Sequence, residues 1–340
     1  MSLRVGILGC GRIAAHFHGP ILAAMPGVAV TALADSDPAN RRRLAYSAPG
    51  ANHYGDWQTP IDLGEVDAVV ICLPPSLHAP AAIAAFAAGC HVYVEKPMAL
   101  TIDEGGRMVA AWQKAGTVGM VGFNFRFHPL YTDARRRIAR GELGEIAAIR
   151  TLFTSARRTL PGWKSQPGAG GDALSDLGTH HFDIAAFLTG SAVRPETVMA
   201  DQTRTPDGSF AVATARLEND AVLTLTVGQT TGTSEHRVEI LGEKGHLTVD
   251  LSDAAAQPLR KPPGRFARLT RVAARLRLLS PAEMLHKPGR EPSFGLALSH
   301  FVAAARSGGQ ASPDLHDGMR AMRLVEGALV QPAALRGAAE

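Results

Sequence analysis

The feature that most constrains the fold is an alternation of short apolar runs and amphipathic segments from residue 3 to about residue 122. The runs are rich in Val, Ile, Leu and Ala, and the segments between them have the apolar spacing of helices. This alternation implies right-handed βαβ units and a parallel sheet that is covered on both faces. The expected strands are 3–8, 28–34, 68–72, 91–95 and 118–122, and the expected helices include 12–24, 77–88 and 101–115.

The rest of the chain predicts a second domain. With 340 residues, the chain is too long for one ordinary core and long enough for two. Alternating residues at 146–153, 211–217, 221–228 and 237–241, separated in part by the turn sequences Glu218-Asn219-Asp220 and Glu243-Lys244-Gly245, suit consecutive antiparallel strands. Segments 294–306 and 314–329 are expected helices that close this domain. The predicted fold is therefore α/β, with a Rossmann-type domain at 1–122 and a second α/β domain at 123–340.

A glycine turn follows the first expected strand and has the spacing G-x-G-x-x-A, from Gly9 to Ala14. Gly9 permits a tight turn, Gly11 lets the backbone approach a pyrophosphate, and the helix N-terminus offers amide groups to the phosphates. A Gly-rich turn can also be purely structural, but a strand before it and a helix after it are the context of a dinucleotide site. We expect Arg12 and Ile13 to line the cofactor together with the two glycines.

Asp35 ends the second expected strand, about twenty residues beyond the glycine turn, where a carboxylate accepts hydrogen bonds from a ribose. A carboxylate there also repels a 2′-phosphate, which favours NAD over NADP. Two alternatives remain open at this point. Asp35 is also typical of a helix cap, and the arginines at 41–43 could serve a 2′-phosphate or form the solvated face of a helix.

Two short motifs end neighbouring strands of the expected sheet. Glu95-Lys96-Pro97 places an ammonium group at the carboxyl edge, where open α/β sheets bind their ligands. A surface lysine paired with Glu95 is the alternative. In the second motif, Leu73 and Pro74 begin an extended turn on which a nicotinamide ribose could rest, and His78 touches the cofactor or has a structural role. The expected cofactor residues are Gly9, Gly11, Arg12, Ile13, Asp35, Leu73, Pro74, His78, Glu95 and Lys96.

A third motif lies on an expected helix from residue 174 to residue 188. Asp176, His180 and Asp183 recur at i, i+4 and i+7, so they share one helix face. Such a polar stripe is often just solvated. A histidine beside two carboxylates, in a chain that also carries a dinucleotide fingerprint, is equally typical of a proton-transfer site.

The order and spacing of these motifs resemble the Gfo/Idh/MocA family of oxidoreductases, which includes glucose–fructose oxidoreductase and inositol dehydrogenase. The likeness covers nearly the whole chain. It implies a Rossmann domain followed by an α/β domain with a large open, mostly antiparallel sheet, which holds substrate and often forms the oligomer. The matching motifs are Gly9-x-Gly11-x-x-Ala14, Pro74-Pro75-x-x-His78, Glu95-Lys96-Pro97, Asn124-x-Arg126-x-x-Pro129 and the glycine-to-histidine segment from Gly170 to Asp183.

The resemblance also implies roles for individual residues. His180 would accept the hydroxyl proton of a secondary alcohol, because imidazole titrates near neutrality. Lys96 would stabilise the developing alkoxide, and Asp176 would orient His180 or bind a hydroxyl. The family often makes the bond between Lys96 and Pro97 cis.

Four further residues are expected near the substrate. Asn124 and Arg126 follow the last Rossmann strand, although Arg126 could equally pin the hinge between the domains. Trp163 could stack on a sugar ring and Lys164 could donate to it, but a buried anchoring Trp is an equally good interpretation.

Composition narrows the function classes. A net charge of +4 without a basic face interleaved with aromatics argues against nucleic acid. Three cysteines without CxxC spacing indicate a reducing compartment and no metal site, and no signal peptide or membrane span is expected. We therefore expect a cytoplasmic protein. The basic stretch 258–290 could be a lid, an oligomer contact, a site for an acidic group or an inserted solvated helix.

The sequence therefore predicts an NAD-dependent dehydrogenase that acts on a secondary hydroxyl of a sugar, cyclitol or similar polyol. Two rivals remain: a glycoside hydrolase that retains NAD and acts by oxidation and elimination, and a sugar- or NAD-sensing protein without catalysis. A large antiparallel sheet with an uncovered apolar face predicts a homodimer or homotetramer.

Overall fold

The computed structural model describes residues 2–156, 162–166, 168–205, 207–252 and 291–330, so the basic stretch 258–290 lies outside the described residues. The chain divides into two compact units, each made of segments that are distant in sequence. The first unit comprises Met1–Asn124, Gln166–Gly170 and Ser293–Arg323, and the second comprises Phe125–Ser165, Gly171–Pro292 and Leu324–Glu340. A single boundary at residue 122 therefore does not describe the C-terminal third of the chain.

The first unit is built on a six-stranded sheet in the order β3-β2-β1-β4-β5-β6. Every pair in it is parallel, as the alternating pattern predicts. The strand order reverses between β1 and β4, which makes the carboxyl end of β1 the switch point of the sheet. The short polar strand β3 has no apolar signal and is absent from the sequence-based prediction. The strands are β1 (Leu3–Leu8), β2 (Val28–Ala34), β3 (Asn52–Tyr54), β4 (Ala68–Ile71), β5 (His91–Val94) and β6 (Gly119–Val121).

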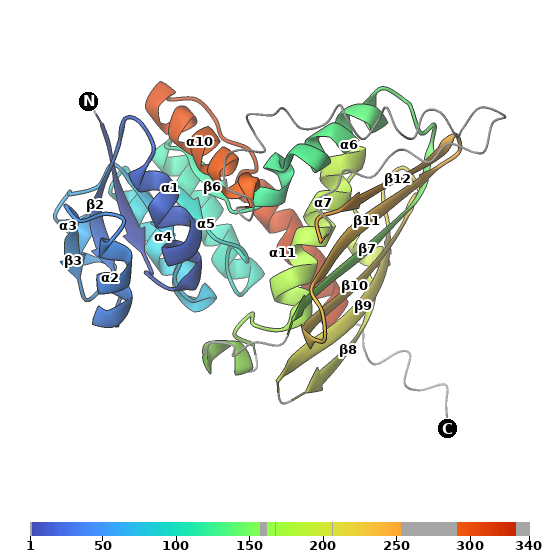
Figure 1. Ribbon diagram of the computed structural model, residues 1–340, viewed down its shortest axis with the longest axis horizontal. Coiled ribbons are helices and arrows are strands. Elements are labelled where there is room, and N and C mark those ends of the chain that lie inside the picture. Colours follow the sequence, from blue (N-terminus) through green and yellow to red (C-terminus); the bar gives the residue numbers. More distant parts are fainter. Residues whose placement is uncertain (1, 157–161, 167, 206, 253–290, 331–340) are drawn as a thin grey trace. The chain divides into compact units, whose positions relative to one another are not determined.

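Helices cover this sheet (Figure 1). A π-helical turn at Ala14–His18 precedes α1, and a 3₁₀ turn at Pro75–Leu77 precedes α4. Helix α5 has complete end signals, since Thr101 and Glu104 form a capping box and Gly116 closes the helix in the left-handed conformation. The helices are α1 (Gly19–Ala23), α2 (Pro38–Ala45), α3 (Thr59–Asp62), α4 (His78–Ala87) and α5 (Ile102–Ala115).

The two C-terminal helices, α10 (Pro292–Ser307) and α11 (Leu315–Val330), form as predicted. The expectation that they close the second domain holds only for the last part of α11, from Leu324, because α10 and the rest of α11 belong to the first unit. In α10, Phe294 stacks on Phe17 with ring centroids 4.3 Å apart, and Phe301 lies edge-on to Tyr93 at 5.7 Å. The first part of α11 also belongs to the core of the first unit. Their partners come from the start of the chain, and helical periodicity carries no information about so distant a contact.

The second unit is built on a six-stranded sheet in the order β12-β11-β7-β10-β9-β8. It is mostly antiparallel, as the family resemblance implies, but β7 and β10 run parallel. The expected run of consecutive antiparallel strands is therefore wrong at this pair, because β7, the earliest strand, lies between β11 and β10. The strands are β7 (Ile146–Ala156), β8 (Met199–Thr205), β9 (Gly208–Arg216), β10 (Val222–Thr231), β11 (Glu235–Gly242) and β12 (Gly245–Asp250).

The two faces of this second sheet differ. Helices α6 (Pro129–Ala139) and α7 (Thr179–Thr189) lie on one face, and no described helix covers the other (Figure 1). In β9, Ala211 and Ala213 point into the core, whereas Phe210 and Val212 point outward and are 38% and 52% exposed. The period-2 alternation therefore leaves apolar side chains on the uncovered face.

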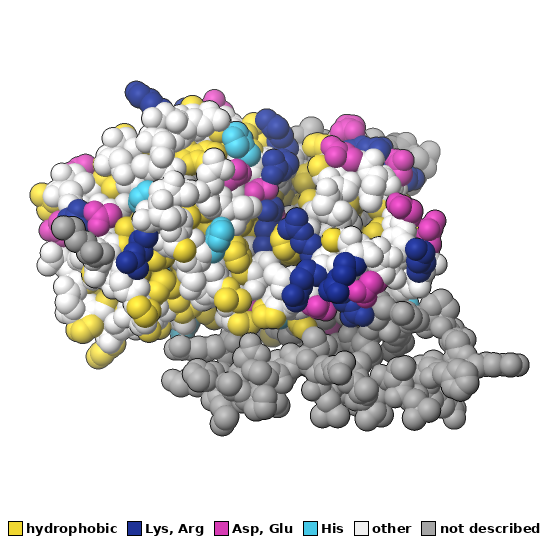
Figure 2. Space-filling model, turned by 90° about the horizontal axis from the view of Figure 1, so that it is seen from above, with side chains coloured by type: hydrophobic (Ala, Val, Ile, Leu, Met, Phe, Trp, Pro, Cys, Tyr) yellow, Lys and Arg dark blue, Asp and Glu magenta, His cyan; other side chains and the backbone are white. Residues whose placement is uncertain are grey.

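The described surface carries mixed charge. On the face drawn in Figure 2, Lys and Arg side chains lie near Asp and Glu side chains. Arg137 of α6, for example, pairs at 3.1 Å with Glu142, which lies beyond the end of that helix. None of the helices in the described ranges is long and apolar enough to cross a bilayer.

Candidate active site

The glycine turn of the first unit has the geometry of a dinucleotide site. Gly9 has φ of +91°, and a Cβ there would lie 2.6 Å from the carbonyl carbon of Cys72, so only glycine fits. At Gly11, by contrast, a Cβ would meet nothing within 4 Å. The backbone is therefore open at Gly11, where a pyrophosphate would approach, and these residues fit an NAD-type cofactor.

Asp35 is held against this turn. Its carboxylate accepts a hydrogen bond from the backbone N–H of Cys10 at 2.8 Å and from that of Asp37 at 2.8 Å. The capping alternative is excluded, because Asp37, whose side chain accepts from Ala39 N, is the N-cap of α2. Arg41 donates to the backbone carbonyl of Asp35. The turn, the end of β2 and the start of α2 thus meet at one carboxylate.

The Glu95-Lys96-Pro97 segment follows β5 at the carboxyl edge of the sheet. The buried Glu95 carboxylate pairs with the His18 imidazole at 2.7 Å, and Lys96 beside it is half-buried. The peptide between Lys96 and Pro97 is cis, as the resemblance implies. No local pattern indicated the His18 partner, which lies 77 positions away in the chain.

His78 lies at the start of α4 and is fully buried. One ring nitrogen lies 2.8 Å from the carbonyl oxygen of Leu73 and the other lies 2.8 Å from that of Pro97. Its ring therefore bridges the two strand-end segments that carry the expected cofactor residues.

In the second unit, the candidate acid–base residues lie where a π-helical turn, Leu174–Gly178, leads into α7. Such turns are frequent at functional sites. Asp176, His180 and Asp183 are each buried, with 6–8% exposure, so the solvated-stripe interpretation is wrong. The His180 ring packs against Phe125, with ring centroids 4.6 Å apart.

Asp176 is the centre of a buried polar network. Its carboxylate accepts hydrogen bonds from Lys164 Nζ and from Gln229 Nε2, the latter at 3.3 Å. The same Gln229 amide donates to the carbonyl oxygen of Gly171 at 2.8 Å, and Lys164 lies 5.4 Å from the ring centroid of Trp163. Gln229 lies on β10 and is absent from the sequence-based site, because nothing in its local pattern distinguishes it from other strand residues.

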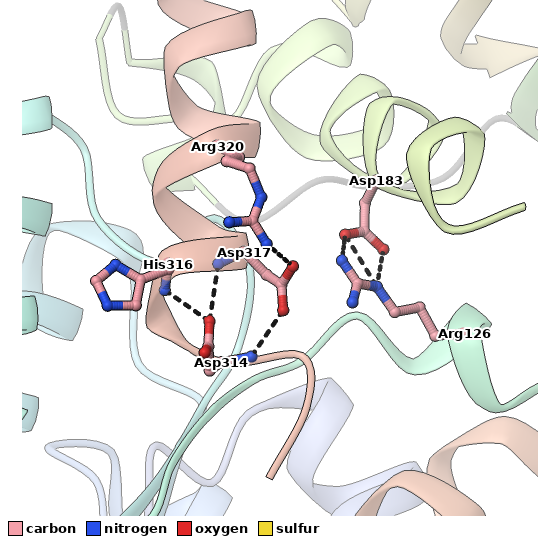
Figure 3. A network of polar contacts seen from close by, with 6 residues as sticks. All are labelled: Arg126, Asp183, Asp314, His316, Asp317 and Arg320. Atoms are coloured by element: carbon pink, nitrogen blue, oxygen red, sulfur yellow. Dashed lines mark hydrogen bonds and ion pairs between the residues drawn. The ribbon is translucent and has the colours of Figure 1, made fainter. Parts of the chain in front are cut away.

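Two expected substrate residues have structural partners. Asn124 is 2% exposed and donates from Nδ2 to Ser293 Oγ at 2.7 Å, which ties the end of β6 to α10. Arg126 binds Asp183 through two nitrogens, with Nε 2.9 Å from Oδ2 (Figure 3). Both partners of this second pair belong to the second unit, where the pair fixes α7 to the segment before α6.

An aromatic and imidazole cluster adjoins His180 through Phe125. The His236 ring stacks on Phe153 at 4.4 Å and packs edge-on against Phe125 at 4.5 Å, and its Nε2 lies 3.0 Å from Tyr131 Oη. His181 completes the cluster, and neither of its ring nitrogens has a hydrogen-bond partner among the described residues. Burial lowers the pKa of His181 to about 3 and lowers the pKa of His236 well below its usual range. The cluster is therefore a neutral packing surface at physiological pH.

Comparison with known proteins gives the family. Residues 3–123 match the model of an oxidoreductase family with an NAD-binding Rossmann fold, and residues 131–248 match the GFO/IDH/MocA C-terminal domain. The chain is 29% identical to an uncharacterised oxidoreductase of Rhizobium meliloti over 98% of both sequences, and 26% identical to an inositol 2-dehydrogenase of the same species over 97% of this chain and 96% of the other. A levoglucosan dehydrogenase in complex with NADH and levoglucosan superposes with a TM-score of 0.80, at 25% identity over 97% of this chain and 96% of the other. The chain therefore belongs to the Gfo/Idh/MocA family of NAD-binding oxidoreductases.

Proposed function

We propose that this oxidoreductase is a dehydrogenase that oxidises a secondary hydroxyl of a cyclitol, a hexose or a related sugar. The observation that carries the proposal is the network that Lys164 and Gln229 form around the buried Asp176, four residues before the buried His180. A set of buried hydrogen-bonding groups suits a polyhydroxylated ring. An apolar alcohol would displace the water around these groups without replacing its hydrogen bonds. The relatives named for inositol and levoglucosan support the same substrate class.

The proposed chemistry divides between the two units. Bound NAD would supply the hydride acceptor. His180, which is buried and packs against the Phe125 ring, takes the proton of the reacting hydroxyl. Lys96 donates a hydrogen bond to the same oxygen and stabilises the charge that develops there. Asp176 holds Lys164 in place to donate to a neighbouring hydroxyl.

We further propose that NAD is preferred to NADP. The Asp35 carboxylate, fixed by the amides of Cys10 and Asp37, would accept from the ribose hydroxyls and repel a 2′-phosphate. Calorimetric titration of the wild type and of Asp35→Asn with both cofactors tests this. Equal or tighter binding of NADP by the wild type would mean that the neighbouring arginines set the preference.

The decisive experiment for the reaction is a panel of cyclitols, hexoses and their glycosides with NAD, followed by the absorbance of the reduced cofactor. Turnover of a polyol in preference to simple alcohols and hydroxy acids supports the dehydrogenase. Cleavage of a nitrophenyl glycoside without net change in NAD would favour the hydrolase. If NAD binds but no member of the panel reacts, the sensing protein becomes the better hypothesis.

We also propose that the second unit binds the substrate and forms a homodimer or homotetramer through the uncovered face of its sheet. Phe210, Val212 and Met199, three large apolar side chains at 38–52% exposure, lie on neighbouring strands of this face. Light scattering of the wild type and of Val212→Lys tests the assembly, and a monomeric wild type at micromolar concentration would contradict it. The three cysteines are free, which is consistent with a cytoplasmic location.

A further inference from the structure

His78 occupies an unusual position between two peptide carbonyls. Its Nδ1 lies 2.8 Å from the Pro97 oxygen and its Nε2 lies 2.8 Å from the Leu73 oxygen, and the side chain is buried at 1% exposure. Leu73 belongs to the segment after β4, and Pro97 follows Lys96 after β5. One imidazole ring thus joins the two segments at the carboxyl edge of the first sheet.

The chemistry of the two acceptors sets the protonation that this arrangement requires. A carbonyl oxygen can only accept a hydrogen bond, and a neutral imidazole carries a single N–H. With a neutral ring, one nitrogen lone pair would face a carbonyl lone pair at 2.8 Å. Both contacts are hydrogen bonds only when both nitrogens carry protons, so the geometry favours the imidazolium.

Opposing influences act on that charge. Burial is the largest and lowers the pKa of His78, while the two carbonyl acceptors and the Glu95 carboxylate raise it and the Lys96 ammonium lowers it. Both charged neighbours belong to the segment that ends β5, and α4 itself contributes no other charged residue. The net effect lowers the pKa of His78. The state with both hydrogen bonds is therefore lost as pH rises through a pKa below the usual value of histidine.

We propose that His78 is a positioning residue whose imidazolium clamps the Leu73–Pro74 turn to the Lys96–Pro97 segment, so that proton loss from one ring nitrogen releases one segment from the other. The catalytic consequence rests on the proposed role of Lys96, whereas the clamp itself does not. While both hydrogen bonds persist, the Leu73–Pro74 turn and the Lys96 backbone keep a fixed position relative to each other. After deprotonation, the remaining N–H can donate to only one carbonyl at a time, so the two segments can move relative to each other.

The direct test is nitrogen NMR of the ¹⁵N-histidine-labelled protein without ligand, with the His78 signals assigned by their loss in His78→Gln. We expect both ring nitrogens to be protonated at the acidic end of the range between about pH 5 and pH 8, and one to lose its proton as pH rises. A single neutral tautomer throughout this range would overturn the proposal. This measurement needs no substrate. The chemical shifts of the wild type report the protonation state, and the variant serves only to assign them.

The functional test uses His78→Phe, which keeps a planar ring but donates to neither carbonyl, and His78→Gln, which keeps a donor. At the acidic end of the same pH range, we expect NAD affinity by calorimetry, and kcat with a polyol, to fall on the order of tenfold or more in His78→Phe, with partial recovery in His78→Gln. KM for the polyol should change little, and the wild-type dependence of NAD affinity on pH should disappear in His78→Phe. Unchanged NAD affinity and kcat in a folded His78→Phe protein would refute the clamp.

His91→Phe is the matched control. His91 lies at the opposite end of β5, where its Nδ1 accepts from Val118 N at 3.0 Å. Burial lowers its pKa too, so its loss should affect thermal stability without changing the pH profile or kcat. If the wild type reduces no NAD with any polyol, while the NMR and calorimetric results hold, the proposed reaction fails and the clamp stands.

Discussion

The first unit holds its candidate cofactor groups through backbone geometry, whereas the second holds its candidate catalytic groups through buried side chains. At the glycine turn, the amide of Gly9 donates to the carbonyl oxygen of Ala34, and the amide of Cys10 donates to the Asp35 carboxylate. At the start of α7, Asp176 depends on Lys164 and Gln229, which lie 12 and 53 positions away in the chain. Backbone geometry follows from a short local motif, but a side-chain network requires the whole fold.

This difference predicts that substitutions of the candidate catalytic residues in the second unit lower the catalytic rate and leave cofactor binding intact. The largest effect is expected for His180→Ala. Loss of the proposed general base should lower kcat by about a hundredfold to ten-thousandfold. The NAD dissociation constant from calorimetry should remain close to that of the wild type, because the candidate cofactor residues lie in the other unit. Near-normal turnover by this variant would remove His180 from the mechanism.

Buried ion pairs of the second unit should be sensitive to the loss of one partner. Arg126→Met leaves the buried Asp183 carboxylate without its bidentate cation, and the free energy of unfolding should fall by about 3–5 kcal/mol. The control is Arg150→Met, which breaks the more exposed pair of Arg150 and Glu239 and should cost about 1 kcal/mol or less. Denaturant unfolding measures both. Equal losses would show that burial does not set the strength of these pairs.

In the first unit, two glycines of the same turn should respond differently to one added methyl group. Gly9→Ala combines φ of +91° with a contact at 2.6 Å, so we expect a loss of at least about 1–2 kcal/mol in stability together with loss of NAD binding. Gly11→Ala meets no protein atom within 4 Å, so its melting temperature should be unchanged while its NAD affinity falls. Normal NAD binding by Gly11→Ala would place the pyrophosphate elsewhere.

The effect that is smallest at neutral pH concerns acid stability. The pKa of His181 is lowered to about 3 in the folded protein, so between that value and the ordinary 6.5 the unfolded chain binds the proton more readily. Stability from this group is therefore complete above about pH 6.5 and falls as pH drops, on the order of 1.4 kcal/mol per pH unit. His181→Phe should flatten the decline of unfolding free energy between about pH 6.5 and pH 5. An unchanged slope would mean that other groups control acid unfolding.

Most elements of the first unit could be predicted from sequence alone. Strands β1 and β2 begin and end at the predicted residues, since each is a continuous apolar run in a buried parallel sheet. Strand β3 could not be predicted, because Asn52 and His53 are exposed polar residues whose conformation is set by pairing with β2. In the second unit, the turn sequence Glu218-Asn219-Asp220 predicted the hairpin β9–β10, whereas β12, which follows the turn at 243–245, was not among the expected strands. No local signal indicates that β7 pairs with β10 in parallel.

The sequence by itself determined the chemistry that the chain carries: a glycine turn after a strand, a lysine at a strand end, and a carboxylate and an imidazole four residues apart at the start of a helix. These features are local, and local spacing is what a sequence shows. Only the tertiary structure decided which groups face them. It paired Glu95 with His18, Asp176 with Gln229 and Asp183 with Arg126, and it placed His78 between two carbonyls. The physical reason is that a buried polar group needs a hydrogen-bond partner, which the fold can supply from any part of the chain. The spacing of residues along the chain does not show which of them are close in space.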